Sequence, residues 1–242
     1  METEFNSDEN NFAYPDGIEN TYWNKARNKI IFKTINKYPL LNVLDVGCGR
    51  GIVTGYLLKK GIQIEGIELG NTTPISNSKI PVKYNTNALS LPEELSNLYN
   101  TISLFDVIEH IENPEKFLHD LVSHFNNVEF LIITVPAHNE LWTNFDEYYG
   151  HFKRYELSTI ENELQKIGFD IIVNKYFFHT LYLLIKISNR FFKKREIQFN
   201  VPGRFLTLFN NVISQLFYWE SILVPQKFYG SSIICIAKKS KK

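Results

Sequence analysis

The sequence predicts a Rossmann-like α/β fold with a doubly wound sheet. Two observations predict it. Short apolar segments of strand type alternate with helical segments along most of the chain, as in successive parallel βαβ units. A glycine-rich stretch, "LDVGCGRG" at Leu44 to Gly51, directly follows the first buried-type strand. In sheets of this kind, ligands bind at the carboxyl ends of the strands.

The composition is typical of one globular domain in a reducing compartment. The chain has 242 residues, 44% of them hydrophobic, which is enough for one substantial core. Basic and acidic side chains number 26 each, so no overall positive field indicates nucleic acid, and no DNA partner is expected. Cys48 and Cys235 make no disulfide framework and have no metal-ligand neighbours at zinc spacing, which favours a cytoplasmic location.

Both the amino-terminal segment and the most apolar segment argue against export or membrane insertion. The first is acidic, polar and rich in Asn, unlike a secretory signal, and we expect residues 1–18 to be a flexible tail before a domain at 19–242. The apolar segment from Tyr176 is interrupted by charged and polar residues. It is shorter than the roughly 20 apolar residues of a spanning helix.

The first half of the chain predicts an entry helix and three strands around the glycine loop. The expected elements are a helix at about 20–37, a strand at 42–46, a helix at 52–61, a strand at 62–68 and a weaker strand near 82–88. Pro39 ends the entry helix, because proline cannot continue it, and Gly61 closes the second helix.

The second half continues the alternation and then departs from it. The expected elements are a strand at 100–105, a helix at 114–125, a strand at 130–135, a helix at 157–169, a strand at 170–178 and a last strand at 231–237. The signal from Ser158 to Glu161 predicts where the second of these helices starts. A helical pattern over about 178–230 is far longer than the roughly 2 to 5 residues of a hairpin loop, so we expect a helical insertion before the last strand.

The glycine spacing and one acid distinguish among ligands for the loop. The glycines are Gly47, Gly49 and Gly51. Ile52 stands where the dinucleotide pattern has its third glycine, and the Lys-Ser/Thr pair of a P-loop is absent from the sequence there. Asp45, as an unpaired carboxylate beside the loop, would repel a pyrophosphate and attract a ligand with an ammonium and a sulfonium. S-adenosylmethionine is therefore favoured over NAD.

Four segments together resemble the class I S-adenosylmethionine-dependent methyltransferases. They are "LDVGCGRG", Glu68 at the end of the second strand, "NALSLP" after the third strand and "LFDVIEHI" after the fourth. The resemblance extends from about Tyr22 to Phe177. It implies a seven-stranded sheet of order 3-2-1-4-5-7-6 with an antiparallel last strand, and S-adenosyl-L-methionine as the cofactor.

The resemblance also implies which residues hold that cofactor. The implied cofactor-binding residues are Asp45, Gly47, Cys48, Gly49, Gly51, Glu68, Leu69, Asn87, Ala88, Phe105 and Asp106. Asp45 would hold the methionine end, Glu68 the ribose, and Asn87 with Ala88 the adenine. Asn87 stands where relatives commonly have Asp, so this contact would come from an amide.

Candidates for the chemistry follow the fourth and fifth strands. Methyl transfer needs positioning and, for a hydroxyl acceptor, often a base, and the candidate catalytic residues are Asp106, His110 and His151. In one alternative, Asp106 borders the cofactor while Glu109 and His110 orient the acceptor, with no metal. In the other, these three join His151 in a metal site. That set is similar to those of metal-assisted O-methyltransferases of quinone synthesis and of small-RNA 2′-O-methyltransferases.

The acceptor is predicted less sharply. "GHFKRY" at 150–155 is similar to a segment of bacterial methyltransferases associated with cell-surface glycans and lipid-linked saccharides. We expect O-methylation of a saccharide, a lipid-linked intermediate or another small molecule; the alternatives are a metal-assisted O-methyltransferase and a non-catalytic module that binds S-adenosylmethionine. The insertion, with a basic cluster at 193–195, would form a lid or a peripheral membrane contact through residues 179–225.

Overall fold

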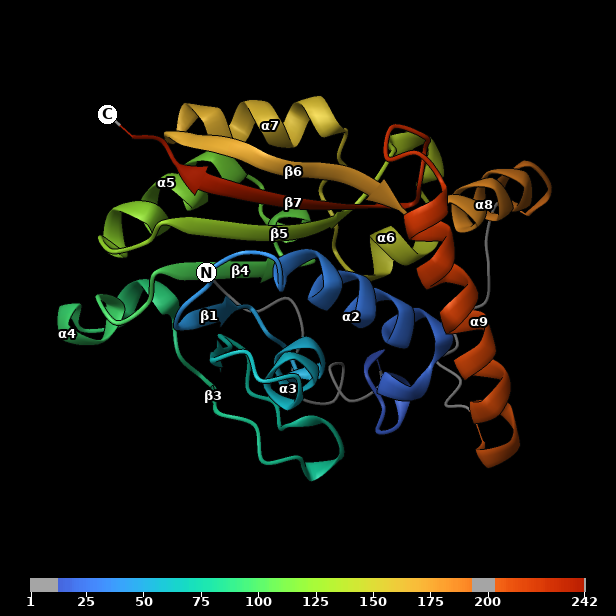
Figure 1. Ribbon diagram of the computed structural model, residues 1–242, viewed down its shortest axis with the longest axis horizontal. Helices are drawn as coiled ribbons and strands as arrows, with labels where there is room; N and C mark the ends of the chain where they lie inside the picture. Colours follow the sequence, from blue (N-terminus) through green and yellow to red (C-terminus); the bar gives the residue numbers. More distant parts are fainter. Residues whose placement is uncertain (1–12, 193–202, 242) are drawn as a thin grey trace.

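The computed structural model describes residues 13–192 and 203–241, in which one seven-stranded sheet carries helices on both faces (Figure 1). The strand order is β3-β2-β1-β4-β5-β7-β6. Neighbouring strands from β3 to β5 pair in parallel, and β7 pairs antiparallel to both β5 and β6. The predicted strand order and the antiparallel last strand are confirmed.

The elements follow the predicted alternation. The strands are β1 (Val43–Val46), β2 (Ile64–Ile67), β3 (Val82–Lys83), β4 (Thr101–Phe105), β5 (Phe130–Pro136), β6 (Phe169–Phe177) and β7 (Ser232–Lys239). The α-helices of the described residues are α2 (Tyr22–Ile35), α3 (Ile52–Lys59), α4 (Glu93–Ser96), α5 (Pro114–His124), α6 (Asn144–Tyr148), α7 (Leu157–Lys166), α8 (His179–Phe191) and α9 (Arg204–Leu223). Helices α8 and α9 form the predicted insertion before β7.

The central strands are buried on both faces, which is why their sequences are nearly continuous apolar runs. All residues of β1 and β4 are buried. Leu118 of α5 and Leu164 of α7 pack on one face of the sheet. Ile30 of α2 and Leu57 of α3 pack on the other. These layers hold the carboxyl ends of β1, β2 and β4 at a common edge.

Helix α9 adds an outer layer rather than a cover for the sheet. It packs along α2 (Figure 1), and Phe217 enters the core and stacks on Tyr22 of α2. None of the helices within 13–192 and 203–241 combines the length and the hydropathy of a membrane-spanning segment.

Helix α7 starts at Leu157 as predicted, but the predicted capping signal at Ser158 is wrong. Glu156 is the residue before the helix and makes no side-chain cap, and Ser158 lies within the first turn. The neighbouring backbone fixes the start without that cap, because Tyr155 exchanges hydrogen bonds with Pro136 and His138 and so holds the chain just before the helix. The Glu156 carboxylate instead binds His138 at 2.9 Å and the Tyr176 hydroxyl at 2.7 Å.

Residues 13–18 also differ from the expected flexible tail. The Arg50 guanidinium donates to the carbonyl of Tyr14 at 2.5 Å and to the Asp16 carboxylate at 2.7 Å. The Asp16 carboxylate also accepts from the backbone N–H of Ser76 at 2.9 Å. Arg50, which holds this segment, is distant from it in sequence, so the polar composition of the segment did not predict these contacts. Residues 1–12 and the basic cluster at 193–195 lie outside the described residues.

Candidate active site

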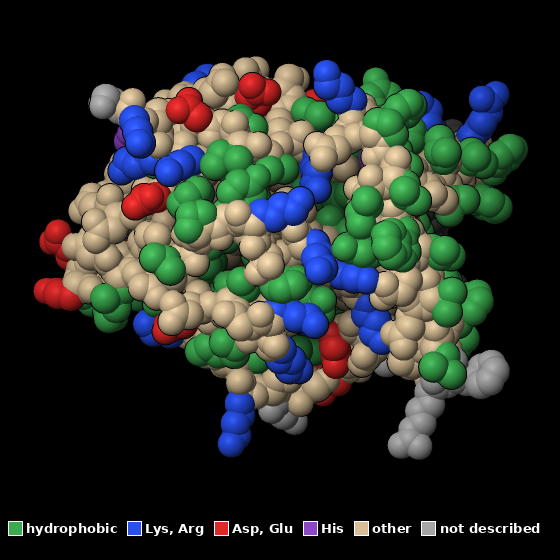
Figure 2. Space-filling view, viewed as in Figure 1, with side chains coloured by type: hydrophobic (Ala, Val, Ile, Leu, Met, Phe, Trp, Pro, Cys, Tyr) green, Lys and Arg blue, Asp and Glu red, His purple; other side chains and the backbone are tan. Residues whose placement is uncertain are grey.

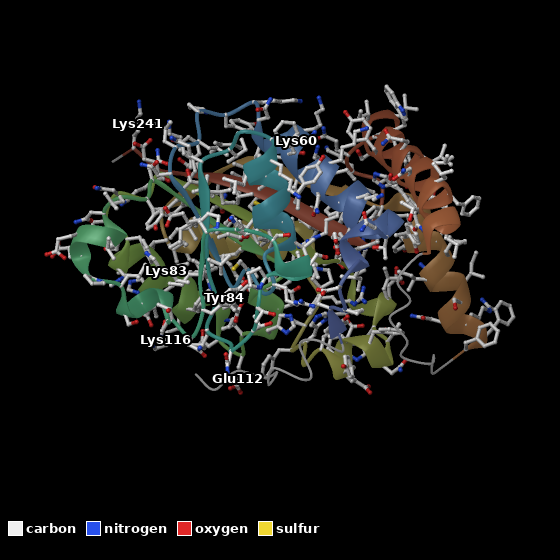
Figure 3. All side chains as sticks on the ribbon, turned by 90° about the horizontal axis from the view of Figure 1, so that it is seen from below. Lys60, Lys83, Tyr84, Glu112, Lys116 and Lys241 are labelled. Atoms are coloured by element: carbon white, nitrogen blue, oxygen red, sulfur yellow. The ribbon has the colours of Figure 1, made fainter. Side chains whose placement is uncertain are left out.

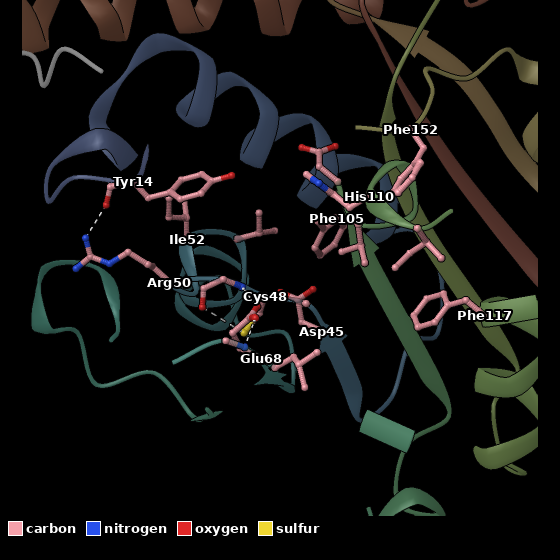
Figure 4. A pocket seen from close by; sticks show the side chains of 18 of the residues that line it. Tyr14, Asp45, Cys48, Arg50, Ile52, Glu68, Phe105, His110, Phe117 and Phe152 are labelled. Atoms are coloured by element: carbon pink, nitrogen blue, oxygen red, sulfur yellow. Dashed lines mark hydrogen bonds between the residues drawn. The ribbon is translucent and has the colours of Figure 1, made fainter. Parts of the chain in front are cut away.

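A cavity of about 630 Å³ opens at the carboxyl ends of β1, β2 and β4 (Figure 4), where a doubly wound sheet binds its ligands. The predicted cofactor residues in its lining are Asp45, Gly47, Cys48, Gly49, Glu68, Leu69, Phe105 and Asp106. Gly51, Asn87 and Ala88 are outside the lining. The Asn87 side chain caps its own turn by accepting from the N–H of Leu89 at 3.0 Å, and Leu89 lines the cavity instead.

The loop after β1 needs glycine for its conformation. Gly47 and Gly49 have φ of 72° and 53°, values that side-chain-bearing residues rarely adopt. A Cβ on Gly47 would also come within 2.9 Å of a Val107 methyl group. The loop backbone can therefore pass close to a ligand at the end of the sheet.

Glu68 fixes this loop from the end of β2. Its two carboxylate oxygens accept from the backbone N–H of Gly49 at 2.8 Å and of Gly70 at 2.7 Å. The carboxylate is half-buried at the cavity wall (Figure 4). It is placed to accept hydrogen bonds from a ligand hydroxyl without first being reoriented.

Asp45 differs from the unpaired carboxylate that the sequence suggested. It is 1% exposed, and its oxygens accept from the hydroxyls of Thr54 at 2.6 Å and Ser103 at 3.0 Å. Burial raises its pKa to about 7, against the opposing effect of these hydrogen bonds. Asp45 therefore ties β1 to α3 and β4, and its charge near pH 7 is only partial without a cation beside it.

Asp106, predicted both at the cofactor and in the chemistry, is held by a salt bridge. Its carboxylate lies 2.7 Å from the Arg27 guanidinium and accepts from the Thr134 hydroxyl at 2.9 Å. Its backbone has φ of 56°. Arg27 is 5% exposed and lies 5.1 Å from the ring of Trp23. These contacts fix Asp106 as a wall of the cavity.

Glu109, His110 and His151 come together, as the sequence suggested. One ligand atom from each lies within 4.8 Å of the others. The imidazole rings of His110 and His151 are 4.7 Å apart. Glu109 is fully buried, and neither carboxylate oxygen has a hydrogen-bond partner. Burial, with Asp106 nearby, raises its pKa to about 8. A buried carboxylate without partners beside two imidazoles fits a bound cation, whereas Asp106 is engaged by Arg27.

His151 is oriented by a buried carboxylate. Its Nδ1 lies 2.8 Å from Asp146, which also binds Arg154 at 2.8 and 2.9 Å. Although burial opposes it, hydrogen bonds from His151 and Arg154 hold the pKa of Asp146 well below its usual value. The anion assigns the proton of the neutral imidazole to Nδ1 and leaves Nε2 as the lone-pair nitrogen. Burial lowers the pKa of His151, which favours the neutral ring.

Several lining residues were missed by sequence reasoning. They are Tyr14, Trp23, Asn24, Arg27, Arg50 and Phe152. Most come from α2 and the segment before it, and no motif connects these to the loops after the strands. Phe152 lies within "GHFKRY", a segment from which we predicted only the class of methyl acceptor. Glu112 and Lys116 extend the lining to one edge of the molecule (Figure 3).

His138, another histidine of the loop after β5, is not in this lining. Its ring stacks on Tyr176 at 4.7 Å and lies close to Tyr182 and Tyr229. Its backbone has φ of 61°. It therefore ties β5 to β6 and α8.

The sheet order, the glycine loop and the carboxylate at the end of β2 define a class I S-adenosylmethionine-dependent methyltransferase fold. A family model described as a methyltransferase domain matches residues 17–173, and the chain belongs to this family of methyltransferases. S-adenosylmethionine is the cofactor of this family.

Relatives and solved structures agree with this assignment. The chain is 33% identical over 112 residues to a ubiquinone biosynthesis O-methyltransferase of Rickettsia typhi, a match that covers 44% of each protein. A Rickettsia canadensis protein of the same name is 29% identical over 138 residues, covering 48% of this chain and 58% of the relative. The chain thus spans about half the length of these curated relatives.

The structural matches are longer and lower in identity. An S-adenosylmethionine-dependent methyltransferase from Archaeoglobus fulgidus matches with a TM-score of 0.54 and 22% identity, over 89% of this chain and 92% of the other. Magnesium protoporphyrin IX methyltransferase from Synechocystis PCC 6803, solved with bound S-adenosylhomocysteine, matches with a TM-score of 0.53 and 16% identity, over 96% and 93%. At these identities the matches show the shared fold.

Proposed function

We propose that this methyltransferase transfers the methyl group of S-adenosylmethionine to a hydroxyl oxygen of a small-molecule acceptor. The shared cavity carries the proposal. Glu68 and Asp45 line one side of it, and His110 and Phe152 line the other (Figure 4). A cofactor on the glycine loop and an acceptor beside His110 would occupy one space, as an in-line displacement requires.

The histidine pair supports proton removal from a hydroxyl. As the acceptor oxygen bonds to the methyl carbon, the carbon–sulfur bond breaks and S-adenosylhomocysteine leaves. The hydroxyl proton passes to an imidazole nitrogen. His110 lines the cavity, and His151, neutral and oriented by Asp146, packs against it. In this proposal Asp106 borders the cofactor rather than acting as the base, because Arg27 holds it.

Two features bear on the acceptor class. The relatives named for ubiquinone biosynthesis favour a phenolic hydroxyl, and the rings of Tyr14, Trp23 and Phe152 in the lining suit a planar ring. A saccharide or lipid-linked intermediate is the second acceptor class, supported by the similarity of "GHFKRY". The exposed apolar helices α8 and α9 favour an acceptor with an apolar part.

Methyl transfer from radiolabelled S-adenosylmethionine tests the proposal. Catechols with and without an isoprenoid tail, saccharides, lipid-linked saccharides and amines form the acceptor panel. We expect labelled methyl ethers from at least one hydroxyl class. Transfer to amines alone would overturn O-methylation, and cofactor binding without transfer to any acceptor would indicate a non-catalytic module.

A metal-assisted reaction is the second candidate, favoured by the two unpartnered oxygens of buried Glu109. Glu109, His110 and His151 would hold a divalent cation, with Asp146 orienting His151. A bound cation supplies Lewis-acid polarisation of an acceptor hydroxyl.

Metal titration separates this candidate from the metal-free reaction. Manganese or magnesium should raise the melting temperature of the wild-type protein and should not raise that of Glu109→Gln. Glu112→Gln, a nearby control, should respond like wild type. Full methyl transfer in the presence of EDTA would exclude the metal-assisted reaction.

A further inference from the structure

Most exposed large hydrophobic side chains of the described chain gather on α8, α9 and the turn after α9. The members of this α8–α9 face are Leu183, Leu184, Ile187, Phe191, Phe192, Leu206, Leu208, Phe209, Val212, Leu216, Trp219, Ile222, Leu223, Phe228 and Tyr229. Figure 2 shows such side chains along both helices at one end of the molecule. An exposed apolar patch on this scale marks an interaction surface.

The pattern along α9 shows that the exposure is systematic. Phe209, Val212, Leu216, Trp219 and Leu223 recur at spacings of three and four residues, and each is more than half exposed. The opposite side of the helix packs on α2 and is already buried. A surface helix normally turns a polar side to water, so this helix presents a second apolar side that the rest of the described chain leaves uncovered.

Two lysines of α2 border this face, and their hydrogen-bond partners are neutral. Lys25 of α2 donates to the Asn211 side chain at 2.6 Å. Lys29 donates to the Gln215 side chain and lies 3.8 Å from the ring of Tyr218. Figure 2 shows basic side chains over α2 beside α9. Because amide and aromatic partners carry no negative charge, these ammonium groups still attract an anionic surface.

Acidic residues are scarce on the two helices. The sequence of α8 contains no Asp or Glu, and that of α9 contains only Glu220. The Glu220 carboxylate accepts from the backbone N–H of Thr180 at 2.5 Å. An apolar face that has aromatic side chains and a basic border complements the headgroup region of an anionic lipid bilayer.

We propose that the α8–α9 face docks on the surface of an anionic phospholipid membrane. A single partner helix would cover the stripe on α9 and leave α8 exposed, whereas a lipid surface can cover both helices and Phe228 together. The proposal goes beyond methyl transfer and does not depend on it.

Docking would place the cavity close to the membrane. Tyr22 of α2 stacks on Phe217 of α9 at 5.7 Å, and its backbone N–H donates to Asn210 at 2.7 Å. One and five residues further along α2, Trp23 and Arg27 line the cavity. An acceptor with an apolar tail could therefore reach the cavity from the lipid surface.

Flotation with phospholipid vesicles tests the docking. The full chain should float with vesicles of phosphatidylcholine and phosphatidylglycerol, more weakly with phosphatidylcholine alone, and less as salt is added. Leu216→Glu should reduce the bound fraction about tenfold or more, since it places a charge where docking would bury an apolar side chain in lipid. Leu98→Glu is the matched control. Leu98 is 56% exposed, against 63% for Leu216, and follows α4 at the opposite end of the molecule (Figures 1 and 3).

Fluorescence and oligomeric state complete the test. Trp219 emission should shift to shorter wavelength on vesicle addition, and Trp219→Phe should remove that shift. The proposal would be overturned if the wild-type protein floated with neither vesicle type, or if Leu216→Glu floated as well as wild type. A dimer that Leu216→Glu converts to a monomer, with no vesicle binding, would assign the face to a second copy instead. S-adenosylmethionine affinity of each variant confirms folding, so failure of docking is separable from failure of methyl transfer.

Discussion

Glu68 combines two roles at the residue scale, because the carboxylate that faces the cavity also binds the glycine loop. Its oxygens accept hydrogen bonds from the backbone N–H groups of Gly49 and Gly70. A single substitution should therefore remove a ligand contact and loosen the loop that passes the ligand.

We expect Glu68→Ala to weaken S-adenosylmethionine binding by about 1 to 3 kcal/mol, the range for lost charge-assisted hydrogen bonds. Isothermal titration calorimetry measures the change. Glu65→Ala is the control, because Glu65 lies on β2, the strand that Glu68 follows, and binds the Tyr99 hydroxyl away from the cavity. Equal affinity in Glu68→Ala and wild type would remove Glu68 from the cofactor site.

Asp45 makes folding stability depend on pH. Its pKa is about 7 in the folded protein, against an ordinary value of 3.8 for an exposed Asp side chain, as in the unfolded chain. Between these values the folded state retains a proton that the unfolded state has released, so stability falls as pH rises through this window. Asp45→Asn should therefore lose less stability than wild type between about pH 5 and about pH 8. Denaturant unfolding at the two pH values checks this; parallel losses would contradict the assignment.

The same titration predicts a proton effect on binding. A sulfonium or ammonium placed beside Asp45 favours the ionised carboxylate. At about pH 6.5, below the pKa of Asp45 in the folded protein, binding should therefore release protons. Calorimetry in buffers of different ionisation enthalpy measures the release. Asp45→Asn should abolish this component, and an unchanged buffer dependence would locate the proton elsewhere.

At the element scale, α6 positions the imidazole ring of His151. The side chain of Thr143 caps the helix together with Asp146, and the same Asp146 carboxylate reaches His151 and Arg154. The short helix therefore orients an imidazole that lies one turn beyond its end.

We expect Asp146→Asn to lower turnover about 10- to 100-fold, as loss of an orienting carboxylate does, while cofactor affinity stays close to wild type. His151→Ala should lower turnover at least as far. Glu147→Gln, an exposed neighbour on the same helix, is the control. Activity assays with calorimetry and thermal melts separate a chemical effect from unfolding, and full activity in His151→Ala would exclude a chemical role for that ring.

At the scale of the whole molecule, Arg50 joins parts of the chain that are distant in sequence. It lies in the glycine loop, donates to the carbonyls of Tyr14 and Thr73, and pairs with Asp16. This places the Tyr14 ring in the cavity wall, where burial raises its pKa well above the usual value.

Arg50→Ala should release residues 13–20 and weaken S-adenosylmethionine binding, since the cavity loses one wall. Hydrogen exchange in that segment should rise strongly, with smaller changes in β5. Asp16→Ala is a milder variant because it leaves the carbonyl contacts of Arg50 intact. Unchanged exchange in Arg50→Ala would show that other contacts hold the segment.

The positions of the strands along the chain were predictable because they depend on local pattern, whereas their order in the sheet was predicted from the resemblance to the methyltransferases. The buried run of β5 and the glycine loop after β1 are readable residue by residue. By contrast, α7 lacks the cap predicted at Ser158 and instead follows a backbone bridge between Tyr155 and the end of β5. Tertiary contacts of this kind leave no periodic signal in the chain.

The same division applies to the site. By itself the sequence determined the fold class and the glycine loop, because local pattern and motif spacing have a direct geometric meaning. The grouping of Glu109, His110 and His151 was one of two alternatives and rested on a resemblance, since His151 is distant in sequence from the other two. Only the tertiary structure decided that Asp45 is buried and paired, that Arg27 holds Asp106, and that Tyr14 and Trp23 wall the cavity. Burial and long-range pairing set the charge of a carboxylate, and both depend on residues that folding alone brings together.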